Sequence, residues 1–183
     1  FVRCVHQASP HLTMPATAPN APWTVRQGLR DTAYPGLPYE SRPGLVGGIF
    51  PYEFRLRAFT RDGAPEDSQG VSLDFRRGTV RFTPKVEGLY ALTLEVSDSG
   101  ATPKVVEETF QVRVAASAFV FVAPDGADAE GRGSRESPFK SLAYALAHAK
   151  PDQLIMLRRG EYATGRFVLN DQTAKQLLAY PDE

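Results

Sequence analysis

The amino-acid sequence predicts a mainly β protein in two parts: an antiparallel β-sandwich, followed by the helix-capped start of a right-handed parallel β-helix. Several segments between residues 23 and 116 alternate strictly between apolar and polar residues, which is the period of a half-buried strand. After Phe119 the order changes to strand, loop, helix and further short strands. Three short strands separated by turns are what one coil of a parallel β-helix requires.

Composition excludes several classes of function. The chain has 183 residues, and its 21 Lys and Arg balance its 21 Asp and Glu, so it lacks the positive charge of a nucleic-acid-binding protein. No stretch reaches the roughly 18 apolar residues of a membrane-spanning helix. Cys4 is the single cysteine, so no disulfide can form within the chain. The histidines have no metal-ligand spacing among them.

The chain divides into three regions by composition. Residues 1–22 are rich in Pro, Ala and Thr, which predicts an extended leader. Residues 23–116 predict a sandwich of about seven strands, and residues 117–183 predict the capping helix and first coil. The joint "AASA" (115–118) consists of four small residues and leaves little reach for independent motion. Phe1 begins without the charged and apolar segments of a signal peptide, so we expect a trimmed piece of a longer protein.

Alternation defines three strands of the sandwich most clearly. Each puts its apolar side chains on one face, as a strand with one buried face requires. The residues predicted to face inward are Tyr52, Phe54, Leu56 and Ala58 in the first strand, Tyr90, Leu92, Leu94 and Val96 in the second, and Phe110, Val112 and Val114 in the third. Shorter strands are expected at 23–27, 71–75 and 79–84, with turn-forming segments between them.

One helix is predicted after the acidic loop. Ser137 is expected to cap its N-terminus, and Pro138 suits the first helical position, where its missing N–H costs nothing. Pro151 ends the helix. The apolar stripe expected to face the core is Phe139, Leu142, Ala143, Leu146 and Ala149. Three further strands are expected at residues 153–157, 166–170 and 175–180.

The stretch Gly70–Gly100 resembles the Ig-like and dystroglycan-type cadherin-like domains of bacterial surface proteins. The residues that match their pattern are Gly70, Leu73, Asp74, Gly78, Thr79, Pro84, Gly88, Tyr90 and Asp98. The segment "EGLYAL" is similar to a tyrosine corner, in which the Tyr90 hydroxyl bonds back to the chain. Leu92 stands where antibody domains have a cysteine, so the resemblance implies a sandwich held by its apolar core alone.

The stretch from Phe121 to Tyr162 resembles the N-terminal cap and first coil of secreted parallel β-helix proteins, including polysaccharide lyases of the chondroitinase B and alginate lyase type. The matching residues are Val122, Asp125, Gly126, Asp128, Pro138, Phe139, Ser141, Leu142, Ala145, Pro151, Ile155, Leu157, Gly160 and Tyr162. The chain departs from the pattern at Asp152 and Gln153, where the family favours Gly-Asp. In the lyases the catalytic groups lie on the middle coils, so the resemblance assigns no catalytic residue to this chain.

Three acidic residues are candidate calcium ligands. Asp125 and Asp128 lie in the glycine-rich loop 125–133, and Asp98 closes a predicted strand. Carboxylate oxygens are the ligands that calcium prefers, although the loop lacks the spacing of an EF-hand. The alternative is structural: Asp and Gly form tight turns and hydrogen-bond free backbone amides at the exposed end of a sheet. A phosphate site is disfavoured because the acidic side chains would repel it.

Aromatic side chains suggest a second kind of site. Trp23, Tyr34, Tyr39 and Tyr52 are candidates for a face on which sugar rings stack, and packing in the core is the alternative. No Ser-His-Asp or Cys-His arrangement is supported by the sequence.

The resemblances together imply the non-catalytic N-terminal portion of a secreted or surface-exposed bacterial protein of the polysaccharide-lyase-like β-helix group, which acts on or binds carbohydrate. The alternative is a non-enzymatic adhesion or structural protein of the cell surface. The expected partners are polysaccharide or other cell-surface components, with no nucleic acid and no membrane insertion.

Overall fold

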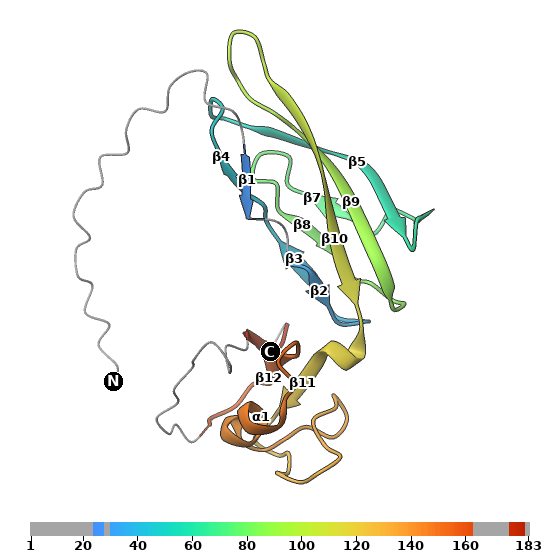
Figure 1. The fold of residues 1–183 in the computed structure, drawn as a ribbon, viewed down its shortest axis with the longest axis vertical. Helices are drawn as coiled ribbons and strands as arrows, with labels where there is room; N and C mark the ends of the chain where they lie inside the picture. The colour runs from blue at the N-terminus through green and yellow to red at the C-terminus, as the bar shows by residue number, and fades with distance from the viewer. Residues whose placement is uncertain (1–23, 28–29, 163–175, 182–183) are drawn as a thin grey trace, which may run out of the picture.

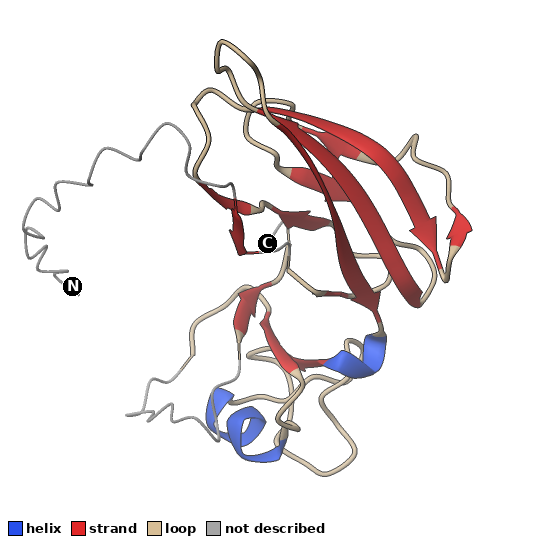
Figure 2. Ribbon diagram, turned by 45° about the horizontal axis from the view of Figure 1, so that its top comes forward, coloured by secondary structure: helices blue, strands red, loops and turns tan. Residues whose placement is uncertain are grey.

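The computed structural model describes residues 24–27, 30–162 and 176–181, and its fold is mainly β (Figures 1 and 2). Two β-sheets and a small ribbon make up the N-terminal part, and a parallel sheet with one short helix makes up the C-terminal part. The predicted leader and the predicted strand at 166–170 lie outside the described residues. No helix in the described part of the chain is long and apolar enough to cross a membrane.

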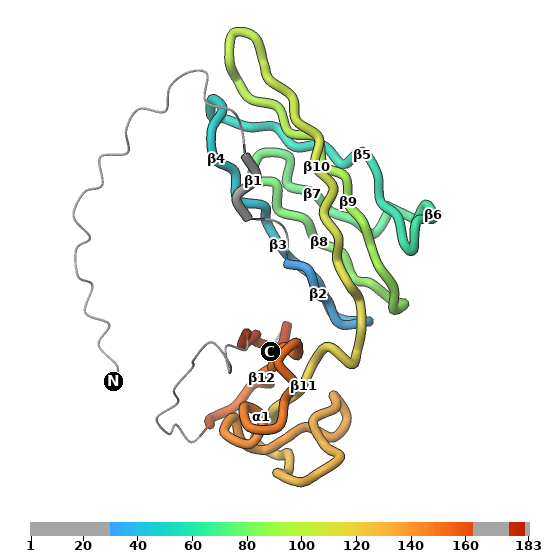
Figure 3. The backbone as a smooth tube through the Cα atoms, in the orientation of Figure 1, coloured from blue at the N-terminus to red at the C-terminus, as the bar shows by residue number. Residues whose placement is uncertain are grey.

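A five-stranded sheet is built around one long hairpin, β9–β10 (Figure 3). Its strands, in spatial order, are β2 (Thr32–Ala33), β10 (Val105–Val114), β9 (Gly88–Ser97), β5 (Glu53–Arg61) and β6 (Ala64–Pro65). Every pairing is antiparallel except that of β2 with β10, which is parallel. The parallel contact places Thr32 and Ala33 beside Arg113 and Val114 at the end of β10, next to the joint.

A smaller sheet faces the long hairpin. It contains β3 (Tyr39–Ser41), β8 (Val80–Phe82) and β7 (Ser72–Leu73), while β1 (Thr24–Gln27) and β4 (Gly44–Val46) form a separate two-stranded ribbon. Tyr39, Val80 and Phe82 from the small sheet pack in one core with residues of β5, β9 and β10. Two sheets that share one core have the arrangement of a β-sandwich.

The predicted inward faces of β9 and β10 are confirmed, since all seven of those side chains are buried. The hydroxyl of Tyr90 donates to the carbonyl oxygen of Val86 at 3.0 Å, as predicted for a tyrosine corner. In β5 the prediction was wrong after Leu56. The register shifts between Leu56 and Ala58, so Ala58 is exposed and Phe59 takes the buried position. A bulge of this kind reverses the alternation downstream.

The two parts of the protein meet at β11 (Phe119–Val122), which follows a short 3-10 helix, η1 (Ala116–Ala118). All four residues of β11 are buried. Phe119 and Phe121 point to a joint core that includes Leu37 and Tyr34 of the sandwich. The Tyr34 ring lies edge-on to both phenylalanine rings, with centroids 5.6 and 5.0 Å away.

The other face of β11 belongs to a second core. Val120 and Val122 pack there with Phe139, Ala145 and Ile155. Because successive side chains of a strand point to opposite faces, four residues are enough to join the sandwich to the C-terminal part.

The C-terminal sheet is parallel, in the order β11, β12 (Leu154–Leu157), β13 (Leu177–Ala179). The segments at 153–157 and 175–180 were expected to be different sides of one coil. That expectation was wrong, because β12 and β13 are hydrogen-bonded neighbours in one sheet. In a parallel β-helix, strands that pair side by side belong to successive coils. Strands on different sides of a single coil do not pair with each other.

The helix α1 (Leu142–His148) begins later than predicted. Ser141, not Ser137, caps it, accepting the Tyr144 N–H at 3.2 Å. Phe139 cannot be helical because its backbone pairs with β11: its N–H donates to Phe121, and its carbonyl accepts from Ala123. Phe139, Ala145 and Ala149 are buried, Leu142 and Leu146 pack against them, and Ala143 of the predicted stripe is exposed.

The joint core predicts a large effect for one substitution. Phe121→Ala should lower the free energy of unfolding by about 3–5 kcal/mol, because truncating a buried phenylalanine leaves a cavity, and Phe121 is 1% exposed. Urea denaturation followed by circular dichroism measures the change. The matched control is Phe50→Ala, since Phe50 is 76% exposed and its loss should change the free energy by less than about 0.5 kcal/mol. Equal effects of the two variants would contradict the described packing.

Candidate functional site

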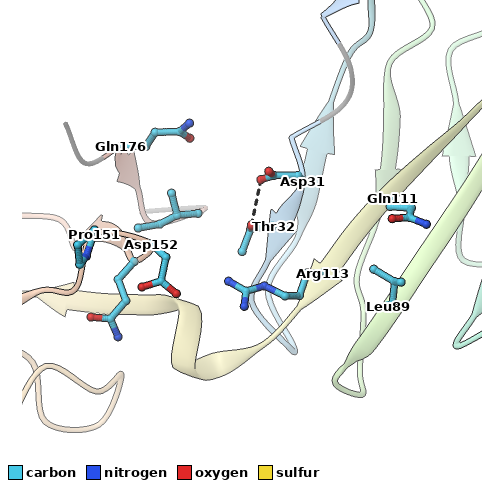
Figure 4. A pocket seen from close by; sticks show the side chains of 10 residues that line it. Asp31, Thr32, Leu89, Gln111, Arg113, Pro151, Asp152 and Gln176 are labelled. Carbon is cyan, nitrogen blue, oxygen red and sulfur yellow. Dashed lines mark hydrogen bonds between the residues drawn. The ribbon is translucent and has the colours of Figure 1, made fainter. Parts of the chain in front are cut away.

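A cleft of about 510 Å³ lies where the sandwich meets the parallel sheet (Figure 4). We call it the joint cleft. It is lined by Asp31, Thr32, Leu89, Gln111 and Arg113 from the sandwich, and by Pro151, Asp152, Gln153, Leu154 and Gln176 from the C-terminal part. Seven of these ten residues have polar or charged side chains, so the cleft is built for hydrogen bonding.

The sandwich wall follows from the alternation of β10. Val112 and Val114 point into the core and are fully buried, so Gln111 and Arg113 point away from it. The parallel pairing of β10 with β2 sets Arg113 opposite Thr32, and the Arg113 N–H donates to the Asp31 carbonyl at 2.7 Å. This pairing brings Asp31 and Arg113, which are far apart in sequence, to the same edge.

The opposite wall is the turn between α1 and β12. The Gln153 side chain accepts from the Lys150 N–H at 2.9 Å and donates to the Ser117 carbonyl at 2.8 Å. These two bonds tie the turn to the joint segment and fix the position of the neighbouring Asp152. In Figure 4, Arg113 and Asp152 project toward each other from the two walls.

Several polar groups of the joint cleft are available to a ligand. Within the described part of the chain, the side chains of Gln111, Arg113, Asp152 and Gln176 have no hydrogen-bond or ion-pair partner. Asp31 accepts one bond, from the Thr32 hydroxyl at 3.0 Å. The lining contains neither Cys nor His, and its hydrogen-bond donors and acceptors suit the binding of a polar ligand.

The sequence identified only part of this site. Outward-facing Gln111 and Arg113 followed from alternation, but nothing in the sequence indicated what would face them. On the other wall, the one local indication in the sequence was that Asp152 and Gln153 stand where the β-helix pattern has Gly-Asp. A turn that has to be tight and has no other role favours Gly at that place.

Asp98, a predicted calcium ligand, serves the backbone. Its carboxylate accepts the N–H groups of Lys104 at 2.8 Å, Ile49 at 3.1 Å and Gly100 at 3.3 Å. The bond from Lys104 is the largest cause that lowers the pKa of Asp98 below its ordinary 3.8; burial opposes it, and the other two bonds add to the lowering. The carboxylate thereby ties the β9–β10 turn to the loop that holds Ile49.

Asp128 also accepts backbone hydrogen bonds. One of its oxygens takes the N–H groups of Lys140 and Ser141, each at 2.9 Å, just before α1. Burial raises the pKa of Asp128, but the bonds from Ser141 and Lys140 outweigh it, so the pKa lies below 3.8. The structural role predicted for the loop is therefore confirmed for Asp128.

The three predicted calcium ligands do not form one group. Asp98 lies at the turn of the β9–β10 hairpin, remote from the loop that carries Asp125 and Asp128 (Figure 1). Among the described residues, no group of three or more His, Cys, Asp or Glu side chains is placed to hold a metal ion. A calcium site on Asp125 and Asp128 would have to be completed by backbone carbonyls and water.

The aromatic residues proposed for sugar stacking are also dispersed. Tyr39 is buried in the sandwich core, and Tyr34 packs in the joint core. Tyr52 donates to the carbonyl oxygen of Gly47 at 2.5 Å in the loop before β5. Trp23 lies outside the described residues. Core packing, the alternative considered for these residues, accounts for Tyr39 and Tyr34.

No protein-family model and no curated protein matches the chain. Among solved structures, it is similar to extracellular cadherin domains 3–6 of protocadherin gamma B2, with 19% identity over 46% of this chain and 22% of that one, and a TM-score of 0.32. A Bacteroides fragilis protein assigned as an alpha-galactosidase/melibiase gives 12% identity over 74% and 28%, with a TM-score of 0.40. The PKD domain of human KIAA0319 gives 21% over 47% and 76%, with a TM-score of 0.31.

These are partial likenesses of fold, and no family membership follows from them. The chain spans less than a third of the length of the protocadherin and Bacteroides fragilis chains.

The role of Asp98 predicts a pH-dependent stability difference. Asp98→Asn should lower the melting temperature at pH 7, because an amide replaces a charged acceptor of three N–H groups. A carboxyl whose pKa is lowered by folding stabilises the protein fully above its unfolded value of 3.8, and this contribution is lost as pH falls through the folded pKa. The difference in melting temperature between Asp98→Asn and the unsubstituted protein should therefore disappear in acid. With chelator present, the control Asp125→Asn should melt as the unsubstituted protein does. A difference in melting temperature between Asp98→Asn and the unsubstituted protein that persists at pH 2 would argue against the assignment.

Calcium binding by Asp125 and Asp128 stays a prediction. Bound calcium would raise the melting temperature, because a ligand that binds only the folded state stabilises it. The measurement is thermal unfolding with calcium and with a chelator, for the unsubstituted chain and for Asp125→Asn. Identical melting temperatures in calcium and chelator would dismiss the site.

Proposed function

We propose that the chain is the non-catalytic N-terminal portion of a secreted or surface-exposed protein of the polysaccharide-lyase-like β-helix group, which acts on or binds carbohydrate. In this proposal residues 23–116 form an Ig-like module, and residues 117–183 begin the coil. The module holds a carbohydrate-binding surface in a fixed position beside the coils.

The observation that carries the proposal is the asymmetry of the parallel sheet. The outer edge of β11 is covered: Phe121 donates to the Gly133 carbonyl and accepts from the Phe139 N–H, and Val122 bridges to Phe139. On the opposite side, β13 has no further strand among the described residues. A sheet with one covered edge and one free edge is suited to growth in one direction, because unpaired strand edges seek partners.

The spacing of the paired strands agrees with a coil. Ile155 pairs with Leu177, 22 positions later, and solenoid repeats have 20–45 residues. Purely parallel sheets also require cover on both faces. Here the joint core covers one face of β11, and α1 covers the other.

Gly126 provides a second feature expected of a cap. A side chain at Gly126 would place its Cβ 2.4 Å from the Phe139 carbonyl oxygen, so the acidic loop can approach the segment covering β11 only with glycine there.

One observation favours the second candidate, a non-enzymatic adhesion or structural protein of the cell surface. The joint core packs the two parts of the chain against each other, and a rigid joint suits a stalk. Both candidates place the chain outside the cell and assign it no catalysis of its own.

In this proposal the chain belongs to a longer natural protein, and the test compares the 183-residue chain with that protein. Incubation with uronate polymers, followed by absorbance of unsaturated products, should give no product with the chain and product with the longer protein. Product from the chain itself would contradict the assignment as non-catalytic. Absence of product from the longer protein would favour the adhesion candidate.

Hydrogen exchange tests the coil independently of any activity. The backbone amides of Leu177 to Ala179 that face away from β12 should exchange fast in the chain and become protected in the longer protein, where the next strand pairs with them. Equal exchange in both proteins would contradict growth of the sheet from β13.

A further inference from the structure

We propose that the joint cleft binds a neutral sugar, which contacts the sandwich and the parallel sheet at the same time. The inference deepens the proposed function, on which it rests for the carbohydrate class of ligand. It adds the place of binding, the side chains that bind and the charge of the ligand.

The donors and acceptors of the joint cleft match a polyhydroxylated ligand. A sugar hydroxyl both donates and accepts, so it needs neighbouring groups of both kinds. Arg113 supplies only donors, Asp152 and Asp31 supply acceptors, and the amides of Gln111 and Gln176 supply both. Four of these five side chains lack any partner in the described part of the chain, so a ligand meets them without first breaking internal bonds.

The charges of the cleft favour a neutral ligand over an anionic one. Two carboxylates, Asp31 and Asp152, line it against the single guanidinium of Arg113. A uronate or sulfate placed here would meet a net negative surface, and like charges close together are repelled. A neutral sugar can instead bridge Arg113 and Asp152, which project from opposite walls (Figure 4).

Apolar side chains complete the lining. Leu89, which is 43% exposed, stands on the sandwich wall, and Pro151 and Leu154 stand on the other. Sugar rings have apolar C–H surfaces as well as hydroxyls, so a mixed lining suits them. The cleft volume of about 510 Å³ lies within the roughly 300–1,000 Å³ of small-ligand sites.

The walls come from different parts of the chain, but their separation is set before any ligand binds. The joint core holds the two parts together, and the bond from Gln153 to the Ser117 carbonyl anchors the turn that carries Asp152. Binding therefore needs little reorganisation of the protein, and preorganisation of this kind lowers the free-energy cost of binding.

The experiment is a glycan array carrying neutral hexose oligosaccharides and uronate oligosaccharides, probed with the 183-residue chain, followed by calorimetry on the best-bound neutral glycan. Three cleft variants are compared, Arg113→Ala and Gln111→Ala on one wall and Asp152→Asn on the other. The controls are Arg55→Ala, an exposed arginine of β5, and Glu107→Gln, an exposed glutamate of β10, both outside the cleft lining.

We expect the unsubstituted chain to bind neutral glycans. The affinity should fall at least about tenfold in each cleft variant for which melting shows an intact fold, and it should stay unchanged in both controls. The three substitutions stand at exposed positions, and Asp152→Asn preserves shape, so loss of binding without loss of folding can be observed on either wall.

Three results would overturn the inference. Neutral-glycan binding that survives the cleft variants would place carbohydrate elsewhere on the chain. Binding to uronate glycans alone would contradict the neutral ligand. Either result would leave the proposed function standing. Absence of binding to any glycan would remove the sugar site, while the product and hydrogen-exchange comparisons with the longer protein would still decide the proposed function.

Discussion

Packing on both faces of the strand Phe119–Val122 is the constraint on which the rest of the structure depends. Its phenylalanines contact the sandwich, and its valines contact the core beneath α1. A shift of this strand by one residue in register would exchange its two faces, and valines would then lie against Tyr34 in place of phenylalanines. The position of β11 in turn sets that of β12, which pairs with it residue for residue, and hence that of the turn at Asp152.

The acidic residues that stand out in the sequence illustrate how local chemistry can suggest more than one role. Asp98 and Asp128 are each aimed at backbone N–H groups in loops, where a carboxylate satisfies donors that no ladder can reach. The side chains of the joint cleft differ in that their polar atoms face space between two parts of the chain. The candidate site therefore differs from the structural carboxylates mainly in having polar atoms that a ligand can reach. Residue type alone does not distinguish the two.

Much of the sandwich could be predicted because β9 and the second half of β10, residues 110–114, alternate without interruption, and Tyr90 has a local partner four residues away. The bulge in β5 could not, since Ala58 and Phe59 are both compatible with an inward position until β9 fixes the register. The helix start was misplaced for a similar reason. Ser137 and Pro138 are good helix-starting residues, but backbone pairing of Phe139 with β11 outweighs them. The joint cleft escaped prediction because its walls meet only through tertiary packing.

The joint core and the joint cleft both require the sandwich and the parallel sheet to behave as one body. Backbone ¹⁵N relaxation measures this directly, because two parts joined by a flexible linker tumble with different correlation times. We expect one rotational diffusion tensor to fit the amides of β9 and β10 together with those of β11 and β12. Separate tensors, with a shorter correlation time for the C-terminal part, would contradict the packed joint and the cleft that depends on it.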